Sequence, residues 1–104
     1  MEKSIAILIP CYNEEKTIKN VILDFKDIFK KSNIYVYDNN STDNTAAIAL
    51  DSGAIVRYEK KQGKGNVVQR MFSDIDADIY LLVDGDSTYD PLTAPTLVAA
   101  VANS

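Results

Sequence analysis

The chain has 104 residues, of which 46% are hydrophobic and 25% are charged, and its formal net charge is −4. This size and composition predict one globular domain and argue against an intrinsically disordered chain. The acidic balance argues against a nucleic-acid-binding surface, because such a surface carries a basic patch. The sequence has no His and a single Cys, so it lacks the commonest general base and cannot form an internal disulfide.

The first half of the chain predicts two strands, each followed by a helix. The first strand covers residues 4–9 and ends at Pro10, which cannot donate to a sheet ladder. Asn13 is a suitable cap for a helix that continues to about residue 31, with Glu14 in its first turn. A second strand is predicted at residues 34–37, followed by a polar turn and a short helix at residues 45–50.

The second half repeats this alternation. A third strand is predicted at residues 54–58, and the basic, glycine-containing segment 62–66 then opens a helix whose apolar face runs to Ile75. The fourth strand, residues 79–83, is apolar throughout, and a last helix is predicted at residues 94–102. Strands that alternate with helices predict an α/β fold, with a parallel sheet of about four strands and helices on both faces.

The location of the protein is predicted from two features of the sequence. The apolar run near the N-terminus is too short for a signal peptide, and no run approaches the ~20 residues of a membrane span. The lone Cys11 fits a reducing compartment, and its place after a strand predicts a small buried side chain. We therefore expect a cytoplasmic protein, or one that works at the cytoplasmic face of a membrane as part of a longer chain.

Polar side chains follow three of the four predicted strands. They are Tyr12, Asn13 and Glu14 after the first strand, Asp38 after the second, and Asp84 and Asp86 after the fourth. Ligands of open α/β sheets bind outside the carboxyl ends of the strands, so these side chains are expected at one edge.

The pattern Asp-x-Asp occurs three times in the chain, but only Asp84 and Asp86 lie at the carboxyl end of a strand. Two carboxylates at that place suit Mg²⁺ or Mn²⁺ carried in with a phosphate. Lys64, between two glycines, offers a flexible cation near the same edge.

Each of these features also has an interpretation without a ligand. Asp38 alone is equally consistent with organising the turn at residues 39–41. Glu14 can complement a helix dipole, and Lys64 in a short glycine loop is more typical of a solvated side chain. The loop lacks the glycine spacing of a Walker motif, and the turn after the first strand lacks the Gly-x-Gly-x-x-Gly of a dinucleotide site.

Four blocks of sequence together resemble the family 2 glycosyltransferases, which are nucleotide-sugar enzymes with the GT-A fold and include polyprenyl-phosphate sugar transferases. The blocks are Ile-Leu-Ile-Pro-Cys-Tyr-Asn-Glu-Glu at residues 7–15, Val-Tyr-Asp-Asn-Asn-Ser-Thr-Asp-Asn-Thr at 36–45, Gly-Lys-Gly-Asn at 63–66 and Val-Asp-Gly-Asp at 83–86. They occur in the family's order and cover nearly the whole chain.

The resemblance implies a role for each candidate site residue. It implies that Pro10, Tyr12 and Glu14 line the nucleotide pocket, and that Asp38 contacts the base. It also implies that Asp84 and Asp86 bind the metal, Mg²⁺ or Mn²⁺, and that Lys64 lies near the diphosphate. Many members carry a second acid where this chain has Asn39. The resemblance identifies no catalytic base in the chain, and Asp90 is only the nearest candidate by position.

The resemblance further implies a nucleotide-diphospho-sugar donor, with UDP favoured over GDP, and inverting transfer to an acceptor hydroxyl or phosphate, with polyprenyl phosphate among the candidates. Family members continue past the Asp-x-Asp through strands that carry the acceptor site and the base. We therefore expect residues 1–104 to be a single, truncated donor-binding domain. The alternatives are a non-catalytic nucleotide-binding module and a nucleotidyltransferase.

The family's strand order, 3-2-1-4, would leave the fourth strand at one edge of the sheet. That strand is apolar and has no internal Lys or Pro to discourage pairing with another chain. An exposed edge of this kind predicts self-association, most simply as a homodimer.

Overall fold

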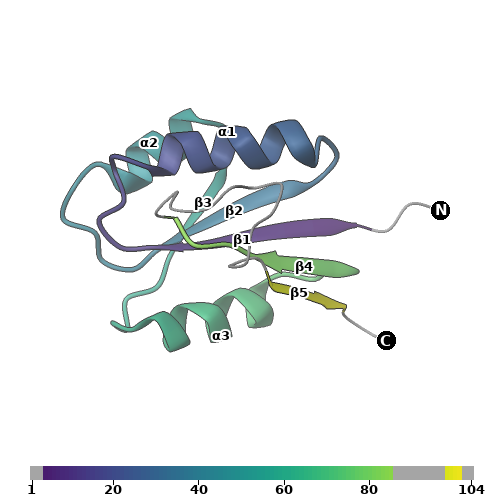
Figure 1. Cartoon of the computed structure of the whole chain (residues 1–104). Coiled ribbons are helices and arrows are strands. Elements are labelled where there is room, and N and C mark those ends of the chain that lie inside the picture. The colour runs from purple at the N-terminus through teal and green to yellow at the C-terminus, as the bar shows by residue number, and fades with distance from the viewer. Residues whose placement is uncertain (1–3, 86–97, 102–104) are drawn as a thin grey trace.

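A computed structural model describes residues 4–85 and 98–101. Its helices and strands follow one another along the chain as β1 (Ile5–Cys11), α1 (Ile18–Ile28), β2 (Asn33–Asp38), α2 (Thr45–Asp51), β3 (Ile55–Tyr58), α3 (Lys64–Asp74), β4 (Ile79–Leu82) and β5 (Val98–Val101). The strands form one sheet in the order β3-β2-β1-β4-β5. Helices α1 and α2 cover one face of the sheet and α3 covers the other (Figure 1). The predicted α/β class and the strand order 3-2-1-4 are confirmed.

The central strand β1 divides the core into two layers. Its Ile7 and Ile9 pack with α1, which buries Ile18, Val21, Ile22 and Phe25 against that face. Its Ala6 and Leu8 point the other way and pack with Val67 and Met71 of α3. A strand buried on both faces reads as a continuous apolar run, and this is why residues 5–9 contain no polar residue.

Strand β1 continues through Pro10, so the prediction that Pro10 ends the strand is wrong. Pro10 pairs with Tyr37 and Cys11 with Asp38 in the parallel ladder with β2. The Leu8 carbonyl accepts from the Val83 N–H, on the β4 side of the strand. Alternate residues of a strand present their backbone groups to the same side, so Pro10, like Leu8, faces the β4 side. Strand β4 ends at Leu82, opposite Leu8, so no ladder bond is lost where Pro10 lacks an N–H group.

The helix predicted at residues 94–102 is wrong over Val98–Val101, which form β5 and pair antiparallel with β4. The rest of that predicted helix lies outside the described residues. A short apolar run with valines suits either structure, and the unpaired edge of β4 supplies the hydrogen-bond partners that decide for a strand. Because β5 covers this edge, the prediction of an exposed β4 edge is also wrong, and the predicted homodimer loses its basis.

Within the ranges 4–85 and 98–101, no helix is both long and apolar enough to cross a membrane.

Candidate functional site

A pocket of about 410 Å³ opens at the carboxyl edge of the sheet, in the crevice beside β1 and β4. It collects residues from the ends of three strands, from the segment before α3 and from α3 itself. The lining residues are Pro10, Cys11, Tyr12, Glu14, Asn39, Gln62, Gly63, Lys64, Val67, Asp84 and Gly85. The structure therefore brings five predicted site residues together: Pro10, Tyr12, Glu14, Lys64 and Asp84.

Of the other two predicted site residues, Asp38 does not line this pocket. Asp38 lies at the end of β2 with 4% of its surface exposed. Its Oδ2 accepts from the Ser41 N–H at 3.1 Å, so Asp38 does organise the turn that follows β2. Its buried Oδ1 has no hydrogen-bond partner within the described parts of the chain, which leaves one acceptor that a ligand donor could satisfy. Asp86 lies outside the described residues.

The turn after β2 also supports the backbone that carries Tyr12 and Glu14. Side-chain oxygens of this turn and of Thr45, the first residue of α2, accept from consecutive N–H groups after β1: Ser41 from Asn13, Thr45 from Glu14 and Asp43 from Glu15, at 2.8, 2.8 and 3.3 Å. In return the Asn13 side-chain oxygen accepts from the Thr42 N–H at 2.8 Å. These reciprocal bonds fix the pocket wall that carries Tyr12.

Asn13 does not cap a helix, and this part of the sequence-based prediction is wrong. Asn13 has a φ of 53°, and α1 begins only after Thr17. The left-handed conformation, which Asn tolerates better than most residues, turns the chain so that residues 13–15 meet the turn after β2. Polar residues 41–43 of the predicted turn, together with Thr45 at the start of α2, are therefore also the partners of the loop after β1.

Lys64 and Asp84 face each other across the pocket. The Lys64 Nζ lies 2.5 Å from the Asp84 Oδ1, and the two side chains remain 60% and 36% exposed. Lys64 is the first residue of α3, whereas Asp84 follows β4. An ion pair this open to solvent contributes little to the stability of the fold. The two side chains can therefore separate at little cost.

The Asp84 carboxylate has the chemistry of a ligand for a hard divalent cation. It is an oxygen donor at a strand end, and in this structure a cationic nitrogen already lies against it. Residues 4–85 and 98–101 contain no group of three His, Cys, Asp or Glu side chains that could hold a metal by themselves.

The turn that presents Asp84, residues 83–85, is packed tightly against the wall after β1. A Cβ atom at Gly85 would lie 3.0 Å from the Cys11 Sγ and 3.4 Å from the Glu14 Cγ. The Gly85 carbonyl accepts from the Thr17 hydroxyl at 2.6 Å. Thr17 precedes α1 as its N-cap residue, yet its side chain makes no capping bond to the helix. The hydroxyl thus serves the turn after β4.

Cys11 is a packing residue of the pocket floor. It is free and 3% exposed. Burial raises the pKa of its thiol well above the ordinary value, and the neighbouring carboxylates of Glu14 and Asp38 raise it further. A thiol that stays protonated is neither a nucleophile nor a metal ligand.

Sequence reasoning singled out neither Asn39 nor Gln62 as a pocket residue. It treated Asn39 only as a departure from a family acid and Gln62 only as part of a basic loop. The position of Asn39 directly after Asp38 at a strand end was the available signal.

Comparison with known proteins identifies the family of the chain. Residues 6–104 match Glycosyl transferase family 2. The chain is 60% identical over 95 residues to the protein RfbJ of Shigella flexneri, covering 91% of this chain and 74% of that protein. It is 40% identical over 96 residues to the glycosyltransferase AglJ of Haloferax volcanii, covering 91% of this chain and 31% of AglJ.

A solved structure shares the fold. The glucosyl-3-phosphoglycerate synthase of Mycobacterium tuberculosis, in complex with Mn²⁺, uridine diphosphate and phosphoglyceric acid, superposes with a TM-score of 0.73 at 29% identity. That match covers 80% of this chain and 33% of the synthase, so the chain spans about a third of both this enzyme and AglJ. The strand order, the crevice at the carboxyl edge and the sequence match agree: the chain belongs to glycosyl transferase family 2.

Proposed function

We propose that the pocket binds a nucleotide-diphospho-sugar, and that the protein is a metal-dependent glycosyltransferase. The observation that carries the proposal is the pair Lys64 and Asp84, facing each other across a pocket at the carboxyl ends of the strands. A diphosphate with a divalent cation carries both negative and positive charge, so it matches a site that offers one ammonium group and one carboxylate. The family and the UDP complex of the related synthase support the same ligand.

The proposal assigns a role to each candidate site residue. Tyr12 is 50% exposed and offers a ring face to the base, next to Pro10 and Glu14. The unpartnered Oδ1 of Asp38 would accept from a base N–H. Lys64 has a flexible side chain and would contact the diphosphate. Asp84 and Asp86 would hold Mg²⁺ or Mn²⁺, which neutralises charge on the departing nucleoside diphosphate.

The finer parts of the proposal concern the reaction. The donor is a UDP-sugar in preference to a GDP-sugar, and the related synthase with UDP supports this choice. The sugar is transferred with inversion to an acceptor hydroxyl or phosphate, with polyprenyl phosphate as one candidate acceptor. The protein works in the cytoplasm or at the cytoplasmic face of a membrane, where nucleotide sugars would reach this pocket.

Calorimetric titration of the chain with UDP and GDP, each with Mn²⁺ and with EDTA, tests the proposal. We expect UDP to bind at least about tenfold more tightly with Mn²⁺, which corresponds to about 1.4 kcal/mol. Asp86→Asn should remove most of this difference. Equal affinity for UDP with Mn²⁺ and with EDTA would contradict the metal role, and no binding of either nucleotide would contradict the donor site.

A further inference from the structure

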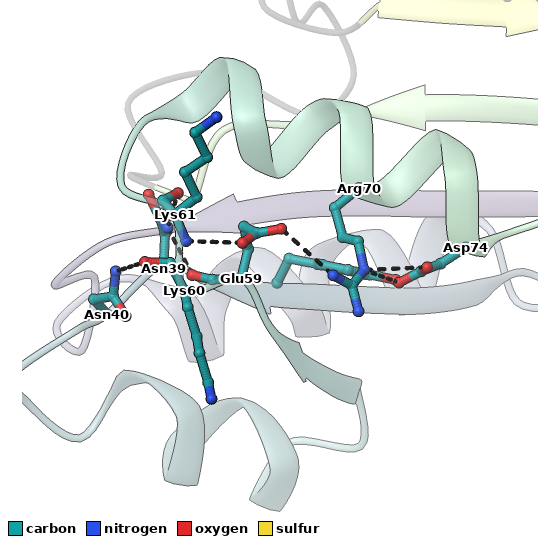
Figure 2. Close-up of polar contacts among 8 residues, drawn as sticks. Asn39, Asn40, Glu59, Lys60, Lys61, Arg70 and Asp74 are labelled. Carbon is teal, nitrogen blue, oxygen red and sulfur yellow. Dashed lines mark hydrogen bonds and ion pairs between the residues drawn. The ribbon is translucent and has the colours of Figure 1, made fainter.

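One buried side chain organises the segment that leads into α3. Asn39, directly after β2, is 4% exposed. Its Nδ2 donates to the carbonyls of Glu59 and Lys61, at 2.8 and 3.0 Å. Its Oδ1 accepts from the Gly63 N–H at 2.9 Å and from the Gln62 Nε2 at 3.2 Å. Figure 2 shows Asn39 beside Glu59, Lys60 and Lys61. We call residues 59–63 the 59–63 loop.

These four bonds use the whole hydrogen-bonding capacity of the amide. A primary amide has two N–H donors and two acceptor lone pairs, and each has a partner within the loop. Asn39 therefore lines the pocket without a free polar group for a ligand. An acid at this position would place an oxygen against the carbonyls of Glu59 and Lys61, so the loop requires an amide.

The last residue of the loop, Gly63, connects it directly to Lys64. Gly63 is the N-cap of α3 and has a φ of 126°, which favours glycine. Its carbonyl accepts from the N–H groups of Asn66 and Val67, at 3.1 and 3.3 Å, in the first turn of the helix. Lys64 follows Gly63 directly as the first residue of this turn, so the bond that the Gly63 N–H donates to Asn39 sets where the Lys64 side chain leaves the backbone.

Neighbouring contacts hold the rest of the loop and the far end of α3. The Asn40 Nδ2 donates to the Lys60 carbonyl at 2.8 Å. The Glu59 carboxylate accepts from the Lys61 N–H at 2.8 Å and pairs with Arg70 at 3.6 Å. Arg70 in turn bonds Asp74 at 3.0 Å (Figure 2). Arg70 and Asp74 both belong to α3, and the Tyr37 hydroxyl of β2 donates to the Asp74 Oδ2 at 2.8 Å. The far end of α3 is thus tied to β2, and the loop bears on its first turn.

We propose that Asn39 is a positioning residue for Lys64 and so sets the affinity for the diphosphate part of the ligand. The proposal deepens the donor-binding function above and rests on it. Asn39 acts through the loop and Lys64, because its own polar groups are all taken. Replacing Asn39 therefore lowers the affinity for UDP, which carries the diphosphate, and does not change the affinity for uridine, which carries none.

A double-mutant cycle with two ligands tests this role. We expect Asn39→Ala to weaken the binding of UDP about tenfold and the binding of uridine less than twofold. A tenfold loss that depends on Lys64 is within the range of coupling energies between interacting residues. Lys64→Met should cause a similar loss for UDP, and Asn39→Ala should add nothing further in the Lys64→Met background. Asn20→Ala, an exposed site on α1, is the matched control and should change neither affinity. Equal losses for UDP and uridine, or the same tenfold loss in both backgrounds, would overturn the proposal.

Amide hydrogen exchange tests the positioning without a nucleotide. In Asn39→Ala the amides of Asn66 and Val67 should exchange faster, whereas that of Ile75, at the other end of α3, should not. Unchanged exchange at Asn66 and Val67 would overturn the proposal. If Asn39→Ala does not fold, the exposed Asn40→Ala should produce the same pattern with smaller effects. Failure of the wild-type chain to bind UDP would refute the donor function alone, and the exchange data would still decide the role of Asn39.

Discussion

The two walls of the pocket that carry Asp84 and Lys64 are held in different ways. The turn at residues 83–85 lies so close to Cys11 and Glu14 that a Cβ atom at Gly85 would meet their side chains at 3.0 and 3.4 Å. The 59–63 loop is instead held by hydrogen bonds from the single amide of Asn39. The wall that carries Asp84 is fixed by packing, and the wall that carries Lys64 is fixed by the hydrogen bonds of Asn39. Added volume should therefore damage the first, whereas lost hydrogen bonds should damage the second.

The largest expected effect is on UDP binding, and it differs between the wall that carries the Asp84 carboxylate and the wall that carries the Lys64 ammonium group. Asp84→Asn should abolish most of the Mn²⁺ dependence of UDP binding, because the turn supplies the carboxylate. Lys64→Met should weaken UDP about tenfold with Mn²⁺ and with EDTA alike, because an ammonium group contacts phosphate with or without a metal. Calorimetric titration checks both, with Asp51→Asn, at the exposed end of α2, as the control. Loss of Mn²⁺ dependence in Lys64→Met would contradict this division.

The packing of the first wall predicts a steric effect. Gly85→Ala places a methyl group 3.0 Å from the Cys11 Sγ and should destabilise the protein by about 1–3 kcal/mol, as overpacking does. Cys11→Ala in the same chain should recover part of this loss, since it removes the sulfur. Gly65→Ala meets nothing within 4 Å and should be neutral or slightly stabilising. Urea unfolding measures all three. An unaltered stability of Gly85→Ala would show that the turn has free space.

A smaller effect is expected from the hydrogen bond that the Thr17 hydroxyl donates to this wall. Thr17→Val keeps the shape but removes the donor to the Gly85 carbonyl, which should cost about 1 kcal/mol in unfolding free energy. Thr17→Ser keeps the hydroxyl and should retain most of the stability. A loss of equal size in both variants would assign the effect to the methyl group of Thr17 and not to the bond.

The smallest expected effect concerns pH. Burial alone would raise the pKa of Asp43, but bonds from the Thr45 hydroxyl and from the N–H groups of Thr45 and Glu15 lower it overall. The stabilisation from a depressed carboxyl pKa is present above the unfolded-state pKa, about 3.9, and is lost as pH falls through the folded-state value. Unfolding at pH 6 and at pH 3 should therefore differ less in Asp43→Asn than in the wild type. An identical difference in the two proteins would count against this role.

The sequence predicts the parallel sheet well because β1, β2 and β4 each contain a short apolar run followed by polar residues. It could not distinguish Asp38 from Asp84, which follow strands in the same way. Asp38 is buried, whereas Asp84 is partly exposed at the pocket. That difference depends on contacts with segments distant along the chain. The strand Val98–Val101 was missed for the same reason, since its structure is decided by the edge of β4.

The most direct test of a metal–nucleotide site at this edge is paramagnetic broadening of amide signals by Mn²⁺ with UDP. We expect the strongest broadening at the pocket, at Tyr12, Lys64 and Gly85, with Mg²⁺ and UDP as the diamagnetic reference. The pocket at the opposite edge of the sheet, lined by Ile5, Phe29 and Ile79 among others, should be affected least. Broadening centred on that second pocket, or spread evenly over the surface, would contradict the site.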